Sequence, residues 1–188
     1  MTTPIPPLIT PSAAPTQERR SGAGWLWLFR PVRLEACRST CQFIFRILTQ
    51  QFAAKVIAGV LIGLFIPNAG LTDRSALLRD PALALILLVL VAPPVETLLL
   101  QAAPIEILRS LGRSRRFQFL GGSIPFAALH FAGGVGSGIA AGIIGGISFS
   151  HTYLEGRSRS WWTALRITTI THGLHNLVCL PVILLLPG

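Results

Sequence analysis

The stretch Val91-Ala-Pro-Pro-Val-Glu-Thr-Leu-Leu-Leu-Gln101 decides how this chain can fold. It contains one carboxylate, Glu96, in the second half of an otherwise uncharged apolar run that starts at Pro81. On translocon scales an ionised group at the middle of a bilayer costs about 2.5 to 3.5 kcal/mol. Glu96 therefore indicates either a functional site or a neutral acid that hydrogen-bonds neighbouring helices together.

Two later apolar stretches each carry histidine, Phe126-Ala-Ala-Leu-His130 and His172-Gly-Leu-His-Asn176. Polar groups in three apolar stretches are more typical of a functional site than of scattered helix contacts. On a helix, His172 and Asn176 share one face because they are four residues apart. His175 is rotated from Asn176 by about 100°, and we expect it to stand outside the site.

Composition indicates an integral membrane protein. Of the 188 residues, 51% are apolar and 12% are charged, and the mean hydropathy is +0.62, which is typical of a chain that lies in a lipid bilayer. A net charge of +9 also suits nucleic-acid binding, but the basic residues separate the apolar runs and do not form an aromatic-laced face. We predict contact with lipid and none with nucleic acid.

The apolar runs predict an all-α, polytopic transmembrane helix bundle. About five spans are expected, at residues 52–66, 82–103, 117–132, 134–151 and 162–186. Arginine clusters in the loops 104–116 and 155–160, whereas 68–80 and 133–136 are neutral or nearly so. The positive-inside rule then predicts an amino-inside, carboxyl-outside topology. The first and third spans are shorter than the roughly 20 residues that cross a bilayer, so flanking residues must extend them or the bilayer must thin.

The region before the spans divides into two parts. Residues 1–17 consist largely of Pro, Thr, Ser and Ala without periodicity and predict a disordered tail. Residues 18–50 combine six arginines with tryptophan and phenylalanine, which is typical of a basic amphipathic juxtamembrane segment on an anionic cytoplasmic surface. Residues 51–188 form the transmembrane domain.

Two local features predict how distant polar groups could meet. Pro93 and Pro94 directly precede Glu96 and should kink or open the helix, freeing carbonyls that hydrate a cavity. A four-residue glycine spacing removes side chains from one helix stripe and lets another helix approach closely. These glycines are Gly134, Gly138, Gly142 and Gly146.

The polar groups suit peptide hydrolysis. A carboxylate beside a neutral imidazole can take a proton from water, and an imidazole with a carboxamide can donate hydrogen bonds to an oxyanion. The sequence contains neither a Gly-x-Ser-x-Gly nucleophile elbow nor the His-Glu-x-x-His zinc motif. The alternative without catalysis is a buried polar network that only stabilises helix packing.

Three ordered motifs resemble those of the CPBP membrane proteins. Glu96-Thr97-Leu98-Leu99-Leu100-Gln101 matches Glu-Glu-x-x-x-Arg, with threonine in place of the second glutamate and glutamine in place of the arginine. Phe126 and His130 match Phe-x-x-x-His, and His172 and Asn176 match His-x-x-x-Asn. Over residues 90–180, about half of the chain, the sequence is similar to this family, which comprises the type II CAAX prenyl proteases with bacteriocin-processing and self-immunity proteins.

The resemblance implies an intramembrane endopeptidase in the cytoplasmic (inner) membrane of a bacterium, with residues 51–188 as its protease domain. Its substrate would be a membrane-associated or lipidated protein or peptide. The resemblance further implies that Glu96 and His130 activate the attacking water, while His172 and Asn176 stabilise the oxyanion. Three further motif residues are assigned to substrate binding: Thr97, Gln101 and Phe126.

The resemblance also bears on cofactors and on the rival function. Family members are often labelled metalloproteases, yet the motifs resemble those of glutamate-dependent hydrolysis, and we expect no required cofactor. Zinc is not favoured, although Glu96, His130 and His172 could supply three ligands. The alternative is a noncatalytic immunity or partner-binding protein of the same fold that has lost turnover through changes in its first motif. A transporter or proton relay is weaker because no internal repeat occurs. The sequence predicts neither the substrate's identity nor the oligomeric state.

Overall fold

A computed structural model describes residues 30–66 and 80–185, with side chains described as far as Pro181. All regular secondary structure in these residues is helical, so the predicted all-α class is confirmed. The predicted tail at 1–17, the first part of the juxtamembrane segment at 18–29 and residues 68–79 of the first loop lie outside the described residues.

The described residues form a short 3-10 helix and five longer helical stretches. The 3-10 helix η2 is Leu34–Ala36, and the first long helix is α1, Thr40–Phe65. The second stretch runs through α3 (Pro81–Leu85), the π-helical η3 (Ile86–Val91), α4 (Ala92–Glu96), the π-helical η4 (Thr97–Ala102) and α5 (Ala103–Ser110). Next come α6 (Arg115–Phe131), then α7 (Val135–Ser137), the π-helical η5 (Gly138–Ile143) and α8 (Ile144–Arg157), and finally α9 (Trp161–Leu185).

Three of the helical stretches extend well past the apolar runs that predicted them. α1 begins at Thr40, not near residue 52, because Ser39 Oγ accepts a hydrogen bond from the Gln42 N–H at 3.1 Å and caps the helix there. The second and fourth stretches continue to Ser110 and Arg157, past their predicted ends at 103 and 151. Those boundaries were wrong because hydropathy detects the apolar part of a helix, whereas charged residues prolong it beyond that part.

Two of the described helices, Thr40–Phe65 and Pro81–Ser110, are long and apolar enough to cross a membrane. Large apolar side chains lie exposed along them, among them Leu64 and Phe65 on α1 and Leu90 and Leu99 on the second stretch. This distribution is expected of helices that face lipid. The composition of these two helices therefore supports two of the five predicted spans.

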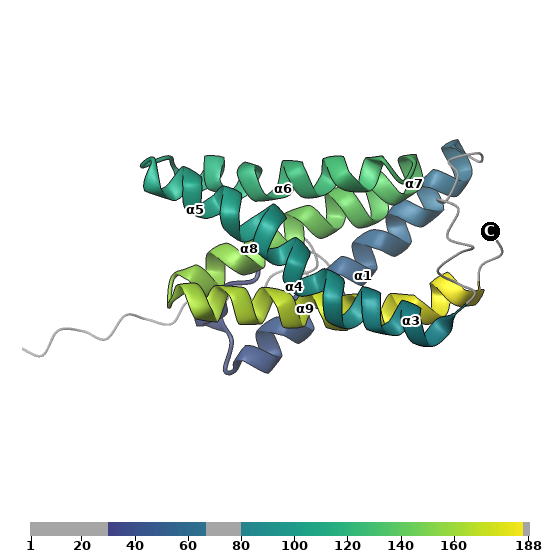
Figure 1. Cartoon of the computed structure of the whole chain (residues 1–188), viewed down its shortest axis with the longest axis horizontal. Helices are drawn as coiled ribbons and strands as arrows, with labels where there is room; N and C mark the ends of the chain where they lie inside the picture. The colour runs from purple at the N-terminus through teal and green to yellow at the C-terminus, as the bar shows by residue number, and fades with distance from the viewer. Residues whose placement is uncertain (1–29, 67–79, 186–188) are drawn as a thin grey trace, which may run out of the picture.

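Successive helical stretches run in alternating directions (Figure 1). The α5–α6 and α8–α9 connections lie at one end of the bundle, and the α6–α7 connection lies at the other. Two ion pairs join the helices at the first end, Arg115 Nη2 with Glu155 Oε1 at 2.6 Å and Arg157 Nε with Glu106 Oε1 at 2.7 Å. The two arginine-rich connections therefore lie together.

Glycines bring α6 close to the fourth stretch, as their spacing predicted. An added Cβ at Gly142 would lie 2.9 Å from the Ala127 carbonyl oxygen, and one at Gly146 would lie 2.8 Å from the Ser123 carbonyl oxygen. No larger side chain fits these positions without moving the backbone of α6. This close contact packs the middle of α6 against η5 and α8.

Candidate active site

The second helical stretch is locally widened beside its two prolines. In the π-helical segment η3, the Ala92 N–H bonds to the Leu87 carbonyl, five residues back. The next carbonyl, that of Leu88, would need the N–H of Pro93, which has none. Asn176 Nδ2 on α9 instead donates to the Leu88 oxygen at 2.8 Å. The predicted opening therefore occurs at Leu88, where a residue of the third motif bonds the freed carbonyl. The predicted hydration of a cavity by such carbonyls stays a prediction.

Glu96 faces His172 across the interface between the second stretch and α9. Glu96 Oε2 lies 3.7 Å from His172 Nε2, and the two side chains are 24% and 3% exposed. This separation exceeds a direct hydrogen bond and is short enough for one oxygen atom to contact both groups. The first and third motifs are thus brought together as the sequence predicted.

Aromatic rings orient the histidines of the second and third motifs. Phe149 stacks on His172 with ring centroids 4.2 Å apart, and Phe126 meets the same imidazole edge-on at 5.6 Å. Phe126 also stacks on His130 at 4.4 Å. At 1% exposure, Phe126 is placed to orient both imidazoles. Its contact with substrate stays a prediction. Phe149 lies outside the three motifs and was missed from the sequence.

The hydrogen bond of His130 decides which of its nitrogens can accept a proton. His130 Nδ1 lies 2.9 Å from the Phe126 carbonyl oxygen. A carbonyl oxygen only accepts hydrogen bonds, so Nδ1 carries the proton in this contact. In a neutral imidazole the other nitrogen, Nε2, is then the acceptor. His130 therefore presents the nitrogen that a role in water activation requires.

Buried polar groups without partners gather around this interface. Eight side chains each have at least one buried polar atom without a hydrogen-bond partner among the described residues, which for the two histidines is Nδ1. These side chains are Gln51, Glu96, Thr97, Gln101, Ser150, Thr168, His172 and His175. Several belong to η4, α8 and α9, which pack against one another. Such atoms are costly in an apolar interior unless water or a ligand supplies hydrogen bonds. The interior therefore has the polarity that a hydrolytic site needs.

The two altered positions of the first motif are enclosed by the packed helices. Thr97 and Gln101 are both 0% exposed, and their side-chain polar atoms are among those without partners. Their π-helical segment, η4, brings residues five apart closer to one face than an α-helix would. Glu96 and Gln101 are five residues apart, so they lie closer to one helix face here than they would on an α-helix. Substrate binding by Thr97 and Gln101 stays a prediction.

Sequence reasoning missed Lys55, the single lysine of the chain. Its Nζ lies 2.6 Å from His175 Nε2, and Phe52 stacks on the same imidazole. Because an ammonium group only donates, His175 Nε2 accepts here and carries no proton. His175 is thus buried beside the site, but its Nε2 accepts a hydrogen bond from the Lys55 ammonium group. A lysine within a predicted span was the signal that could have identified this contact.

The described part of the chain gathers no three His, Cys, Asp or Glu side chains closely enough to hold a metal ion. Glu96, His130 and His172 could have supplied three zinc ligands, but they do not form such a group in this structure. Independence from metal stays a prediction that chelation can test.

Comparison with known protein families gives a match over the region of the three motifs. The family model described as Type II CAAX prenyl endopeptidase Rce1-like matches residues 78–178, more than half of the chain. The chain belongs to this Rce1-like family. The matched residues contain Glu96, His130, His172 and Asn176, so the predicted relationship to the type II CAAX proteases is confirmed. No curated protein matches the chain, and no solved structure does. The family is one of membrane-embedded proteases.

Proposed function

We propose that this Rce1-like protein is an intramembrane endopeptidase that hydrolyses a peptide bond in a membrane-associated or lipidated protein or peptide. The observation that carries the proposal is the pair formed by a partly buried Glu96 and by His172, which is buried among aromatic rings; the two are 3.7 Å apart and lie within the family's matched residues. Glu96 Oε2 has no hydrogen-bond partner among the described residues, which supports a role in binding the attacking water.

The proposed mechanism gives each motif one task. Glu96 takes a proton from water as the water attacks the scissile carbonyl, and His130, whose ring stacks on Phe126, assists through its Nε2. His172, protonated at Nε2, donates towards the oxyanion that forms in the space beside Glu96. Asn176 has two amide protons, and one of them stabilises the Leu88 carbonyl. Its second proton is the one that would reach the oxyanion.

A second candidate is a noncatalytic immunity or partner-binding protein with the same fold. It is favoured by Thr97 and Gln101, which replace two charged residues of the family motif and have fully enclosed side chains without partners. The fold does not require the second glutamate and the arginine of the family motif, because neither the pairing of Glu96 with His172 nor the glycine contacts involve those positions.

Profiling of protein termini separates the two candidates. Membranes from cells that produce the protein should contain new termini in one or a few membrane-associated proteins, which are uncut in cells that lack it. Processing in isolated membranes should continue after a chelator is added, because the proposed chemistry uses a carboxylate as the base. Identical termini in both membranes would favour the noncatalytic function, and activity lost to chelator and restored by zinc would establish a metal-dependent enzyme.

The proposed orientation places the arginine-rich end of the bundle in the cytoplasm. A fluorescent reporter fused after residue 113 in the α5–α6 connection should be active inside the cell. A phosphatase that folds only outside should be active when fused after residue 133 in the α6–α7 connection. Two fusions that report the same side would show that α6 does not cross the membrane and would contradict the five-span arrangement.

A further inference from the structure

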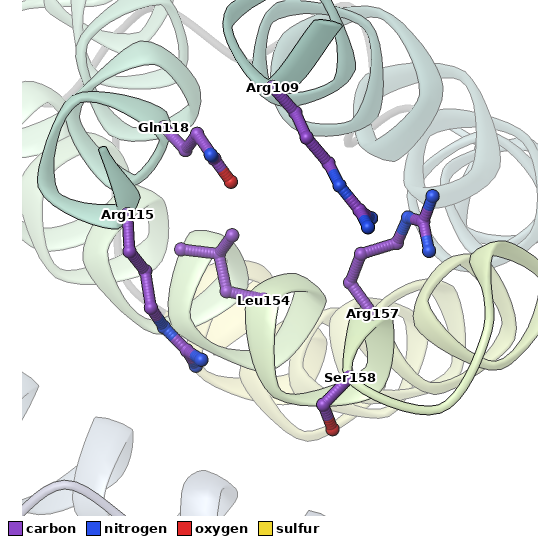
Figure 2. A pocket seen from close by; sticks show the side chains of 6 residues that line it. All are labelled: Arg109, Arg115, Gln118, Leu154, Arg157 and Ser158. Carbon is purple, nitrogen blue, oxygen red and sulfur yellow. The ribbon is translucent and has the colours of Figure 1, made fainter. Parts of the chain in front are cut away.

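A pocket of about 190 Å³ lies at the arginine-rich end of the bundle, where α5, α6 and α8 meet (Figure 2). It is lined by Arg109, Arg115, Gln118, Leu154, Arg157 and Ser158. Arg109 follows Glu96 by 13 residues on one continuous helical stretch, which corresponds to roughly 20 Å. The pocket is therefore separate from the candidate active site.

Three arginines give this pocket its chemistry. Arg109 and Arg157 lie on one side and Arg115 lies on the opposite side, with Leu154 between them (Figure 2). No carboxylate lines the wall. The Ser158 hydroxyl donates to the Glu155 carbonyl oxygen, and Gln118 donates one of its two amide N–H groups to the Arg113 carbonyl oxygen. The guanidinium groups, with the second amide N–H of Gln118, are therefore the donors that a ligand would meet.

Two nearby carboxylates orient two of these arginines. Glu155 accepts from Arg115 Nη2 and from the Leu34 N–H at 3.1 Å. Glu106 accepts from Arg157 Nε and Nη2 and from the Tyr153 hydroxyl at 3.0 Å. Each guanidinium has five N–H donors in a rigid plane, so both arginines keep donors for a second acceptor.

Arg109 supplies the surplus charge. It forms no ion pair with a carboxylate of the described residues, and its charge acts on the same Tyr153 hydroxyl as that of Arg157. Three guanidinium groups thus face two carboxylates, which leaves one net positive charge. A single anion with several oxygen acceptors would neutralise this charge and use the remaining N–H donors.

We propose that this pocket binds a phosphate group, as a phosphodiester in an anionic lipid headgroup or as free phosphate. Planar guanidinium groups match the oxygens of phosphate, and one net positive charge matches a phosphodiester. Trp161 and the exposed Trp162 begin α9, directly after the connection that follows Arg157. Tryptophan is enriched at the level of lipid headgroups, so this end of the bundle lies where phosphate is abundant.

The test measures binding by the purified full-length chain in a neutral detergent. Melting temperature is followed at constant ionic strength as short-chain phosphatidylglycerol, short-chain phosphatidylcholine or inorganic phosphate is added. We expect phosphatidylglycerol to raise the melting temperature more than phosphatidylcholine does. Arg109→Gln should weaken this binding about tenfold, which corresponds to the loss of a charged hydrogen bond.

Arg116→Gln is the matched control, because Arg116 is exposed, neighbours Arg115 and does not line the pocket. It should change binding by less than about twofold, since an exposed charge contributes little. An Arg109-dependent shift with phosphatidylglycerol alone identifies a lipid site, and the same shift with inorganic phosphate identifies a general phosphate site. Equal weakening by both substitutions, or no shift with either phosphatidylglycerol or inorganic phosphate, would overturn the proposal.

Discussion

Glu96→Gln should reduce substrate processing by about 100- to 10,000-fold, which is the range that a positioned general base contributes. Glutamine keeps the length and shape of the side chain but cannot take a proton from water. Glu96 Oε2 has no hydrogen-bond partner among the described residues, so the exchange removes no bond that supports the fold. The variant should therefore accumulate in membranes like the unaltered protein.

The measurement is the rate at which isolated membranes cut a substrate identified by terminal profiling, normalised to the amount of protein. Glu35→Gln is the control, because it removes a carboxylate from an exposed position in η2. It should leave the rate unchanged. Normal processing by Glu96→Gln would exclude Glu96 as the base and would leave the family fold intact.

His172→Phe should lower the rate of cleavage by about 100- to 1000-fold, the usual effect of losing one oxyanion donor. Phenylalanine keeps a ring beside Phe149 and Phe126, so the aromatic packing at 4.2 and 5.6 Å is largely preserved. It removes the nitrogen that faces Glu96. The same membrane assay measures this loss, and the melting temperature of the purified variant shows that the fold is retained.

His175→Gln is the matched control for that substitution. His175 is as buried as His172 and lies on the same helix, but its Nε2 accepts from Lys55. Glutamine offers a carbonyl oxygen in its place, so Lys55 keeps an acceptor and most of the activity should remain. An inactive His175→Gln together with an active His172→Phe would reverse the roles of the two histidines.

Local patterns in the sequence were sufficient for the fold class and for the family. Long apolar runs predict helices because each backbone polar group must be bonded within its own segment when the surroundings are apolar. Glycine spacing predicted the close approach of α6 to η5 and α8, because it depends only on which side chains are missing from one stripe. The motifs around Glu96, His130 and His172 predicted the family because each is a short spacing that can be read directly from the sequence.

Helix ends were less predictable. The Ser39 cap and the charged residues before Ser110 and Arg157 extend helices beyond the apolar runs. The ion pairs Arg115 with Glu155 and Arg157 with Glu106 show why the charged ends stay ordered. Each joins two helices that are distant in sequence, and hydropathy contains no information about such pairs.

Which polar groups meet was decided by the tertiary structure alone. The sequence determined that Asn176 and His172 share a helix face, but only packing directs Asn176 to the Leu88 carbonyl and His172 to Glu96. Packing likewise brings Lys55 to His175 across 120 residues of chain. A residue's chemistry and its position on a helix are local properties. Its partner in the folded protein depends on how whole helices dock, and docking is determined by the packing of many side chains at once.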